Sequence, residues 1–86
     1  MANIASQEKR IQRAERERQE NRRYTSAVKT YFRRLHAAVE DGDADRADAE
    51  HRALSSQIDR AVLRGSVHRR AGARHKARAA RLRASI

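Results

Sequence analysis

Two glycine-centred breaks divide a chain that otherwise favours helix from end to end. The 86 residues include no proline and only three glycines, and Ala, Arg, Glu and Gln predominate, a composition with high helix propensity. Gly42 lies in the run Asp-Gly-Asp, where glycine can end one helix and the next aspartate can cap another. Gly65 follows Arg64 at a second helix end. We therefore predict an all-α chain with helices over about 5–41, 44–64 and 67–85.

Apolar residues recur at helical spacing in each predicted helix. The first helix carries such a stripe only in its second half, from Tyr24 to Val39. The stripes of the other two helices are thin and rich in alanine, so these helices can approach closely but bury little apolar area. Short connections make consecutive helices antiparallel. The pattern predicts one domain over 1–86, a slim three-helix bundle (23–86) with a long, N-terminally extended first helix whose arm spans 1–22.

The positive charge is concentrated in an acid-free segment at the C-terminal end of the sequence. From Arg60 to Ile86 there are nine Arg and Lys residues and no Asp or Glu. Residues 40–59 have a net charge of −5, whereas the whole chain has +10. Because like charges on one helix repel, we expect the counter-charge of 60–86 to come from outside the chain. A phosphate backbone is the usual source, so a nucleic acid is the first candidate partner.

The arm over 1–22 is polar on nearly all sides. Ile4 and Ile11 are its main apolar residues, and a helix of this kind is unstable alone or held by something other than protein. About 20 residues would project ~30 Å from the bundle at ~1.5 Å per residue. We interpret the arm as an RNA-contacting rod that is ordered only on its target. The alternative is a solvated helix supported by pairs such as Glu15 with Arg18.

Other interpretations of the charge remain open. A solvated helix surface would usually mix both signs, and a membrane-surface helix would need more bulky apolar residues than Leu82 and Ile86. A nucleoid-type architectural protein that coats duplex DNA is the main alternative to an RNA-binding protein. A helical adaptor could instead grip a basic partner through the acidic segment. One Phe, two Tyr and no Trp leave few platforms for stacking unpaired bases.

The sequence offers little for catalysis or for metal binding. It has no cysteine, no Gly-rich phosphate loop and no Ser-His-Asp order at a known spacing. His68 and His75 are seven residues apart, too far to chelate one ion without further ligands. We predict no enzyme activity, cofactor, metal or small-molecule substrate. No apolar run is long enough to cross a bilayer, and the polar N-terminus predicts a cytoplasmic protein.

Motifs near both ends of the chain resemble one bacterial family. The opening run Met-Ala-Asn-Ile-Ala-Ser-Gln-Glu-Lys-Arg-Ile resembles the N-terminus of the small-subunit ribosomal protein S-twenty family. Leu63–Arg70 resembles that family's Lys-Gly-Val-Ile-His-Lys-Asn signature, and Asn21-Arg22 and Val28-Lys29-Thr30 fall in register between the two. The resemblance covers the whole chain. It implies a three-helix bundle, monomeric when free, that binds 16S ribosomal RNA directly in the 30S subunit and helps to organise the RNA fold during assembly.

The resemblance also implies which residues face the RNA. The matching positions are Asn3, Ser6, Lys9, Arg10, Arg13, Asn21, Arg22, Lys29, Thr30, Arg33, His68, Arg69, Arg74, Lys76 and Arg78. Charge adds Arg16, Arg70 and Arg81 as further candidates. Ala5 and His75 depart from the family pattern because they stand where a lysine is usual. Ala79 stands where a leucine is usual, which thins the expected core.

Overall fold

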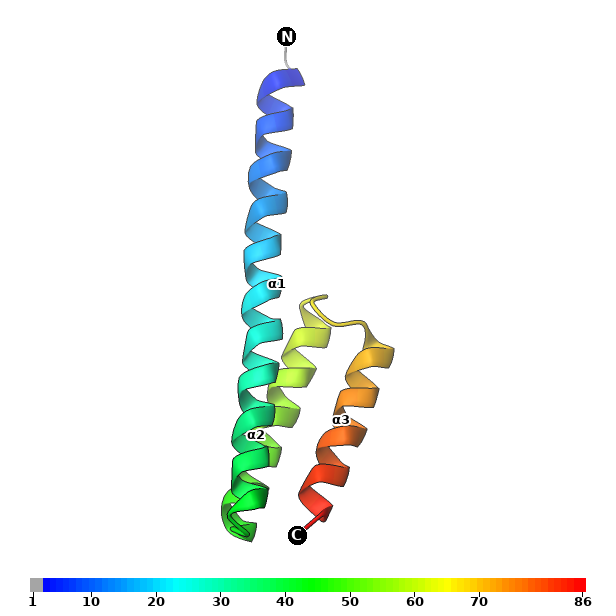
Figure 1. Cartoon of the computed structure of the whole chain (residues 1–86). Coiled ribbons are helices and arrows are strands. Elements are labelled where there is room, and N and C mark those ends of the chain that lie inside the picture. Colours follow the sequence, from blue (N-terminus) through cyan, green and yellow to red (C-terminus); the bar gives the residue numbers. More distant parts are fainter. Residues whose placement is uncertain (1–2) are drawn as a thin grey trace.

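Three helices in series make up the structure, a computed structural model that describes the backbone of residues 3–86 and the side chains from Ile4 onward. They are α1 (Asn3–Glu40), α2 (Ala44–Leu63) and α3 (Arg69–Ala84), and the described part contains no strand. Figure 1 shows α2 and α3 beside the C-terminal half of α1. The overall extents are 63 × 21 × 13 Å, because a 38-residue helix is ~57 Å long. The predicted all-α bundle with a long first helix is confirmed.

The turn between α1 and α2 forms as the sequence predicts. Gly42 has a φ of +68°, a conformation that glycine adopts without steric cost, and its N–H donates to the Val39 carbonyl at 3.0 Å. Asp43 is the N-cap of α2, with its Oδ1 accepting from the Arg46 N–H at 3.1 Å. The helix therefore begins with one of its free N–H groups satisfied.

The connection between α2 and α3 is longer than predicted. Gly65 has a φ of +78°, and the N–H groups of Ser66 and Val67 both donate to the Ala61 carbonyl, at 2.9 and 3.2 Å. The predicted start of α3 at residue 67 is therefore wrong by two residues, because Val67 still closes the end of α2. His68 is the N-cap instead, and its Nδ1 accepts from the Arg70 N–H at 3.1 Å.

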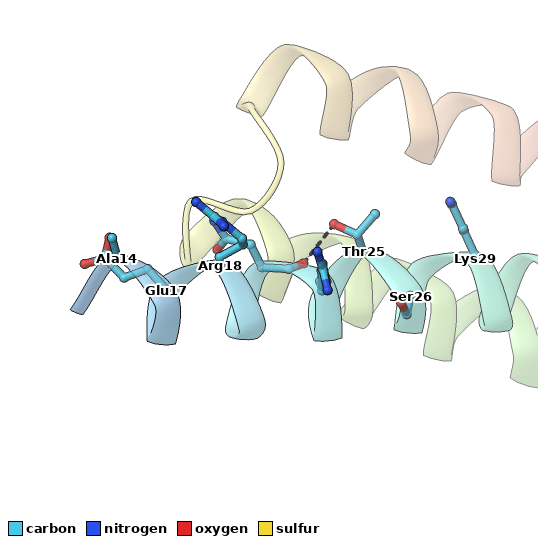
Figure 2. A pocket seen from close by; sticks show the side chains of 8 residues that line it. Ala14, Glu17, Arg18, Thr25, Ser26 and Lys29 are labelled. Carbon is cyan, nitrogen blue, oxygen red and sulfur yellow. Dashed lines mark hydrogen bonds between the residues drawn. The ribbon is translucent and has the colours of Figure 1, made fainter. Parts of the chain in front are cut away.

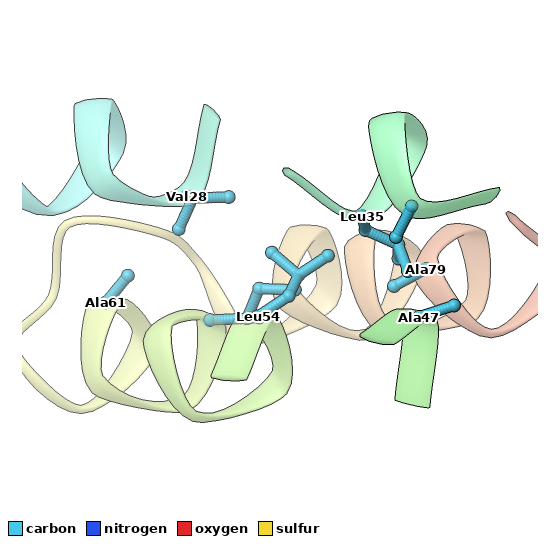
Figure 3. Packing of buried hydrophobic residues seen from close by; sticks show 8 residues of the cluster. Val28, Leu35, Ala47, Leu54, Ala61 and Ala79 are labelled. Carbon is cyan, nitrogen blue, oxygen red and sulfur yellow. The ribbon is translucent and has the colours of Figure 1, made fainter. Parts of the chain in front are cut away.

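The core is small and half of it is alanine. Leu35, Leu54 and Ile58 are its largest fully buried side chains. The other buried apolar residues are Val28, Ala38, Ala47, Ala61 and Ala79. Figure 3 shows these side chains converging from all three helices, and α1 packs mainly on α2, with α3 contacting α2 more than α1. The predicted apolar stripes are confirmed except at Ile86, which was expected to end the stripe of the third helix but lies beyond α3 and is exposed. The thin core expected from alanine at position 79 is also confirmed.

Helix α3 approaches α2 closely at Gly72. This residue is buried, and a Cβ atom at its position would lie 2.5 Å from Cγ2 of Val62. The sequence pattern left either Ala71 or Gly72 as the core position of α3. The structure places Gly72 there, because only a residue without a side chain fits at this distance.

The N-terminal half of α1 extends beyond the bundle. Every side chain from Ile4 to Arg23 is exposed, and Figure 1 shows this part of the helix rising past the α2–α3 connection. Ion pairs join Arg13 to Glu17 at 3.3 Å and Arg18 to Glu15 at 3.6 Å along its surface. Such pairs stabilise a helix by only ~0.2–0.5 kcal/mol each.

Over residues 3–86, none of the three helices is both long and apolar enough to cross a lipid bilayer. Within the same residues, no three His, Asp or Glu side chains come together as a metal site would require.

Candidate nucleic-acid interface

A furrow runs along α1 on the side that faces the α2–α3 connection and α3. It joins two hollows of about 530 and 340 Å³, which share Thr25 and Lys29. The first hollow lies on α1 alone and is shown in Figure 2; its lining is Ala14, Glu17, Arg18, Asn21, Arg22, Thr25, Ser26 and Lys29. The second, here called the α1–α3 hollow, is lined by Thr25, Val28, Lys29, Phe32, Arg33, Val67, His75 and Arg78. The two hollows are open to solvent, and together their linings span α1 from Ala14 to Arg33.

The furrow is strongly basic. Five of its lining residues are permanent cations, namely Arg18, Arg22, Lys29, Arg33 and Arg78, and Glu17 is the one carboxylate among them. The four on α1 occupy one side of that helix because they follow one another at four- and seven-residue spacing, and Arg78 joins them from α3. A concave surface lined by one sign of charge concentrates the opposite charge from solution.

Hydrogen bonds fix the backbone and the wall of the furrow. Ser66 Oγ donates to Asn21 Oδ1 at 3.0 Å, which ties the α2–α3 connection to α1 across 45 residues of sequence. The hydroxyl of Thr25 donates to the Asn21 carbonyl at 2.9 Å, and that of Thr30 to the Ser26 carbonyl at 3.0 Å. Asn21 is thus held at the point where the arm leaves the bundle.

Aromatic contacts orient two side chains of α3 toward α1. The guanidinium carbon of Arg78 lies 4.9 Å from the centroid of the Phe32 ring, a cation–π distance. The His75 ring meets the same phenyl group edge-on, with centroids 6.2 Å apart and planes at 66°. His75, where a lysine was expected from the resemblance, therefore serves as a packing residue in the wall of the furrow.

The predicted site residues divide into three groups. Asn21, Arg22, Lys29, Arg33 and Arg78 come together in the furrow. A second group lies exposed outside the furrow, on the arm, in the second half of α1 or on α3: Ser6, Lys9, Arg10, Arg13, Arg16, Thr30, Arg69, Arg70, Arg74 and Arg81. His68 and Lys76 make contacts within the protein. The side chain of Asn3 lies outside the described residues.

Two cations of the acid-free segment have partners within the chain. Lys76 Nζ lies 3.0 Å from Asp59 Oδ1, and Arg83 Nε donates to Asp48 Oδ1. The expectation that all the counter-charge comes from outside is therefore wrong for these two of nine. The acidic helix α2 thus presents two carboxylates to α3. The hydrogen bond from Arg83 holds the pKa of Asp48 below its ordinary value, and burial opposes this shift only in part.

Sequence reasoning missed several residues of the furrow. Arg18, Thr25 and Phe32 were not among the candidates, although their spacing from Asn21, Lys29 and one another places them on the same side of α1. That periodicity was the available signal, because residues three, four or seven apart share a helix face. Their place at a concave surface depends on where α3 packs, which periodicity does not contain.

The chain is similar to known proteins over almost its whole length. The family model for Ribosomal protein S20 matches residues 2–83. A protein named small ribosomal subunit protein bS20 from Acaryochloris marina is 45% identical, covering 95% of each chain. The protein of that name from Corynebacterium diphtheriae is 45% identical over 88% of this chain and 87% of its own, and that from Kocuria rhizophila is 43% identical over 88% of both. With its three-helix fold and its N-terminal motif, the chain belongs to the ribosomal protein S20 family.

Proposed function

We propose that this protein is a structural component of the small ribosomal subunit that binds 16S ribosomal RNA directly and stabilises the RNA fold during assembly. The observation that carries the proposal is the furrow, where cations of α1 and α3 converge on one concave surface. Similarity to relatives named as proteins of the small ribosomal subunit supports the choice of that subunit as the particle in which the RNA is bound. As a member of a ribosomal protein family, the chain is a structural constituent and not an enzyme, and its place is the ribosome in the cytoplasm.

The mechanism follows from charge. RNA segments that converge in a folded particle repel one another, and Arg and Lys placed between them lower that repulsion and release condensed counterions. Lys29 and Arg33 from α1 and Arg78 from α3 approach the RNA backbone together at the furrow, while the exposed cations of the arm extend the contact to RNA beyond the bundle. Such contacts fix position and recognise backbone shape rather than base sequence.

A charge-matched pair of triple variants tests the furrow. Lys29→Gln, Arg33→Gln and Arg78→Gln together remove three cations that line it. Arg46→Gln, Arg52→Gln and Arg60→Gln remove three from α2 and leave the same net charge. Binding to full-length 16S ribosomal RNA should weaken steeply with salt, and the slope of log K against log salt should lose about 2–3 units in the furrow variant.

The control variant separates a site from a general attraction. If only net charge matters, both triple variants lose the same affinity and the furrow has no special role. If binding of the unmodified protein does not vary with salt, direct RNA binding through phosphate contacts is wrong. Competition with random-sequence duplex DNA addresses the nucleoid alternative, which requires equal affinity for DNA and for 16S ribosomal RNA. Co-sedimentation with 30S particles at moderate salt then tests whether the protein is bound to the assembled subunit.

A further inference from the structure

The α1–α3 hollow combines an apolar interior with a basic mouth. Val28 is buried and Phe32 and Val67 are half-buried, so these three lie deeper than the exposed Lys29 and Arg33. No Asp or Glu lines the hollow. In this it differs from the third hollow of the described surface, whose lining includes Glu17 and Glu20. A site that only binds phosphate needs no apolar interior. Neutralising the charge of the RNA backbone therefore does not account for the apolar residues of this hollow.

The aromatic ring in the hollow is oriented before any ligand arrives. Phe32 is contacted edge-on by His75, and the Arg78 guanidinium lies over it, with its carbon 4.9 Å from the ring centroid. Aromatic rings and guanidinium planes are the two protein groups on which unstacked RNA bases stack. Here both are present at one hollow, and the half-buried Phe32 does not have to be ordered on binding, which reduces the entropy cost of association.

We propose that the α1–α3 hollow receives one unpaired nucleobase of the bound RNA, whose flanking phosphates meet Lys29, Arg33 and Arg78. This proposal rests on the proposed function. A base is flat, apolar on its faces and always flanked by two phosphates, which matches an apolar interior behind a basic mouth. The hollow's volume of about 340 Å³ falls within the range of pockets that hold small organic ligands. An apolar side chain of a protein would not bring the two negative charges.

If the hollow holds a base, the protein selects RNA by the presence of one unpaired base at this position. Its other contacts recognise only the shape of the RNA backbone. A base can enter only if it is unpaired, as in a bulge or loop, so the protein favours RNA that displays such a base beside converging backbones. The scarcity of aromatic residues fits this role. One prepared platform holds a single base, whereas a general single-strand binder needs a series of them.

A pair of neighbouring aromatic residues provides the experiment. Phe32 and Tyr31 are both half-buried, and each lies under an arginine, Arg78 at 4.9 Å and Arg34 at 4.8 Å. Only Phe32 lines the hollow. Phe32→Leu should lower affinity for full-length 16S ribosomal RNA about tenfold, as loss of one stacked base does, without changing the salt slope. Tyr31→Leu should change neither.

Base-specific chemical probing of the same complexes locates the nucleotide. The unmodified protein and Tyr31→Leu should protect at least one unpaired base that Phe32→Leu leaves reactive. If Phe32→Leu fails to fold by circular dichroism, Thr25→Phe replaces it, because this exposed residue can fill the hollow and should expel the base. Ala49→Phe, on the exposed surface of α2, is its control.

The possible outcomes separate this proposal from the function on which it rests. If the unmodified protein does not bind 16S ribosomal RNA, the proposed function itself is wrong. If it binds and Phe32→Leu or Thr25→Phe behaves like its control, with the same protected bases, no base occupies the hollow. If either variant keeps its RNA affinity but a protein partner is lost from the 30S particles, the proposal of a bound base is also wrong. The hollow then receives an apolar side chain of that partner.

Discussion

The absence of a side chain at Gly72 sets how closely α3 lies against α2. A Cβ atom there would meet Val62 at 2.5 Å, and Val62 cannot easily turn away because a β-branched side chain in a helix has one strongly preferred rotamer. Glycine in a helix interior is otherwise unfavourable by ~0.5–1 kcal/mol relative to alanine. Glycine at this position therefore lowers the local helix propensity but permits the close packing of α3 on α2.

Gly72→Ala should destabilise the protein although it improves helix propensity. Overpacking costs ~1–3 kcal/mol and exceeds the propensity gain, so the free energy of unfolding in urea should fall by ~1 kcal/mol. In a Val62→Ala background the clash is absent, and the same substitution should raise the free energy of unfolding by ~0.5–1 kcal/mol. An effect of the same sign in both backgrounds would show that the close approach is not the cause.

A second residue-scale prediction concerns the ion pair between Asp48 of α2 and Arg83 of α3. The hydrogen bond from Arg83, with the charges of Arg83, Arg52 and His51, lowers the pKa of Asp48 in the folded state. A depressed folded pKa stabilises the protein above the ordinary value of 3.8, and this stabilisation is lost as pH falls below it. Thermal unfolding from pH 6 to 2 should show this loss. Asp48→Asn should be less stable than the unmodified protein at pH 6, with a difference that shrinks toward pH 2.

Arg46 and Asp41 provide the comparison for that measurement. Their pair at the α1–α2 turn is also close, at 2.8 Å, but it joins groups near each other in sequence rather than two helices. Asp41→Asn should therefore change the acid limb of the stability profile less than Asp48→Asn does. Equal effects would mean that the acid sensitivity is not specific to the α2–α3 ion pair.

At the scale of whole elements, α1 has two halves held by different forces. Its C-terminal half buries Val28, Leu35 and Ala38 against the bundle. Its N-terminal half has no buried side chain among the described residues, and Ile4 and Ile11 are 61% and 68% exposed. The hydrogen bond from Ser66 to Asn21 ties the base of the arm to the α2–α3 connection. The backbone is a continuous helix, and apart from that bond its first half is supported by local ion pairs on its own surface.

This difference predicts a gradient of hydrogen exchange along α1. In the free protein the amides of residues 4–20 should exchange almost as fast as those of an unfolded peptide, because isolated helices of this length are marginal in water. Those from Val28 to Val39 should be protected by packing. Adding 16S ribosomal RNA should slow exchange in the arm. Strong protection of residues 4–20 without RNA would show that the arm needs no partner to be stable.

The sequence predicted elements better than it predicted contacts. Gly42, Asp43 and Gly65 specify helix ends through local backbone geometry, so those boundaries were accurate. The start of α3 was missed because histidine is not among the usual N-cap residues and Val67 continued the apolar periodicity. Pairs such as Lys76 with Asp59 depend on tertiary packing. The furrow was found only in part for the same reason: the cations of α1 were recognisable, but their meeting with Arg78 follows from how α3 packs.

At the scale of the whole molecule, one cluster of carboxylates lies away from the basic furrow. Glu40, Asp41, Asp43 and Asp45 cluster at the α1–α2 turn, whereas the furrow begins beside the α2–α3 connection, which Figure 1 shows at the other end of the bundle. Such a distribution orients a protein as it approaches a polyanion, with the acidic end turned away. The acidic end should thus add nothing to RNA binding.

Charge reversal at that end tests this polarity. Glu40→Lys with Asp45→Lys should leave the affinity for 16S ribosomal RNA unchanged or modestly higher at low salt, because neither residue lies in the furrow. Co-sedimentation with 30S particles should persist. If the protein instead lost its place in the particle while still binding RNA, the acidic segment would be gripping a basic partner protein, as the adaptor interpretation requires.

The ion pairs from α2 to α3 also bear on how the chain is made. Synthesis runs from the N-terminus, so Asp48 and Asp59 leave the ribosome before the cations with which they pair. The antiparallel pair of α1 and α2, joined by a short turn, can form while α3 is still being translated. The most basic segment of the protein thus emerges beside carboxylates already in position. A nascent chain with the opposite order of helices would expose its cations to any nearby nucleic acid before it had folded.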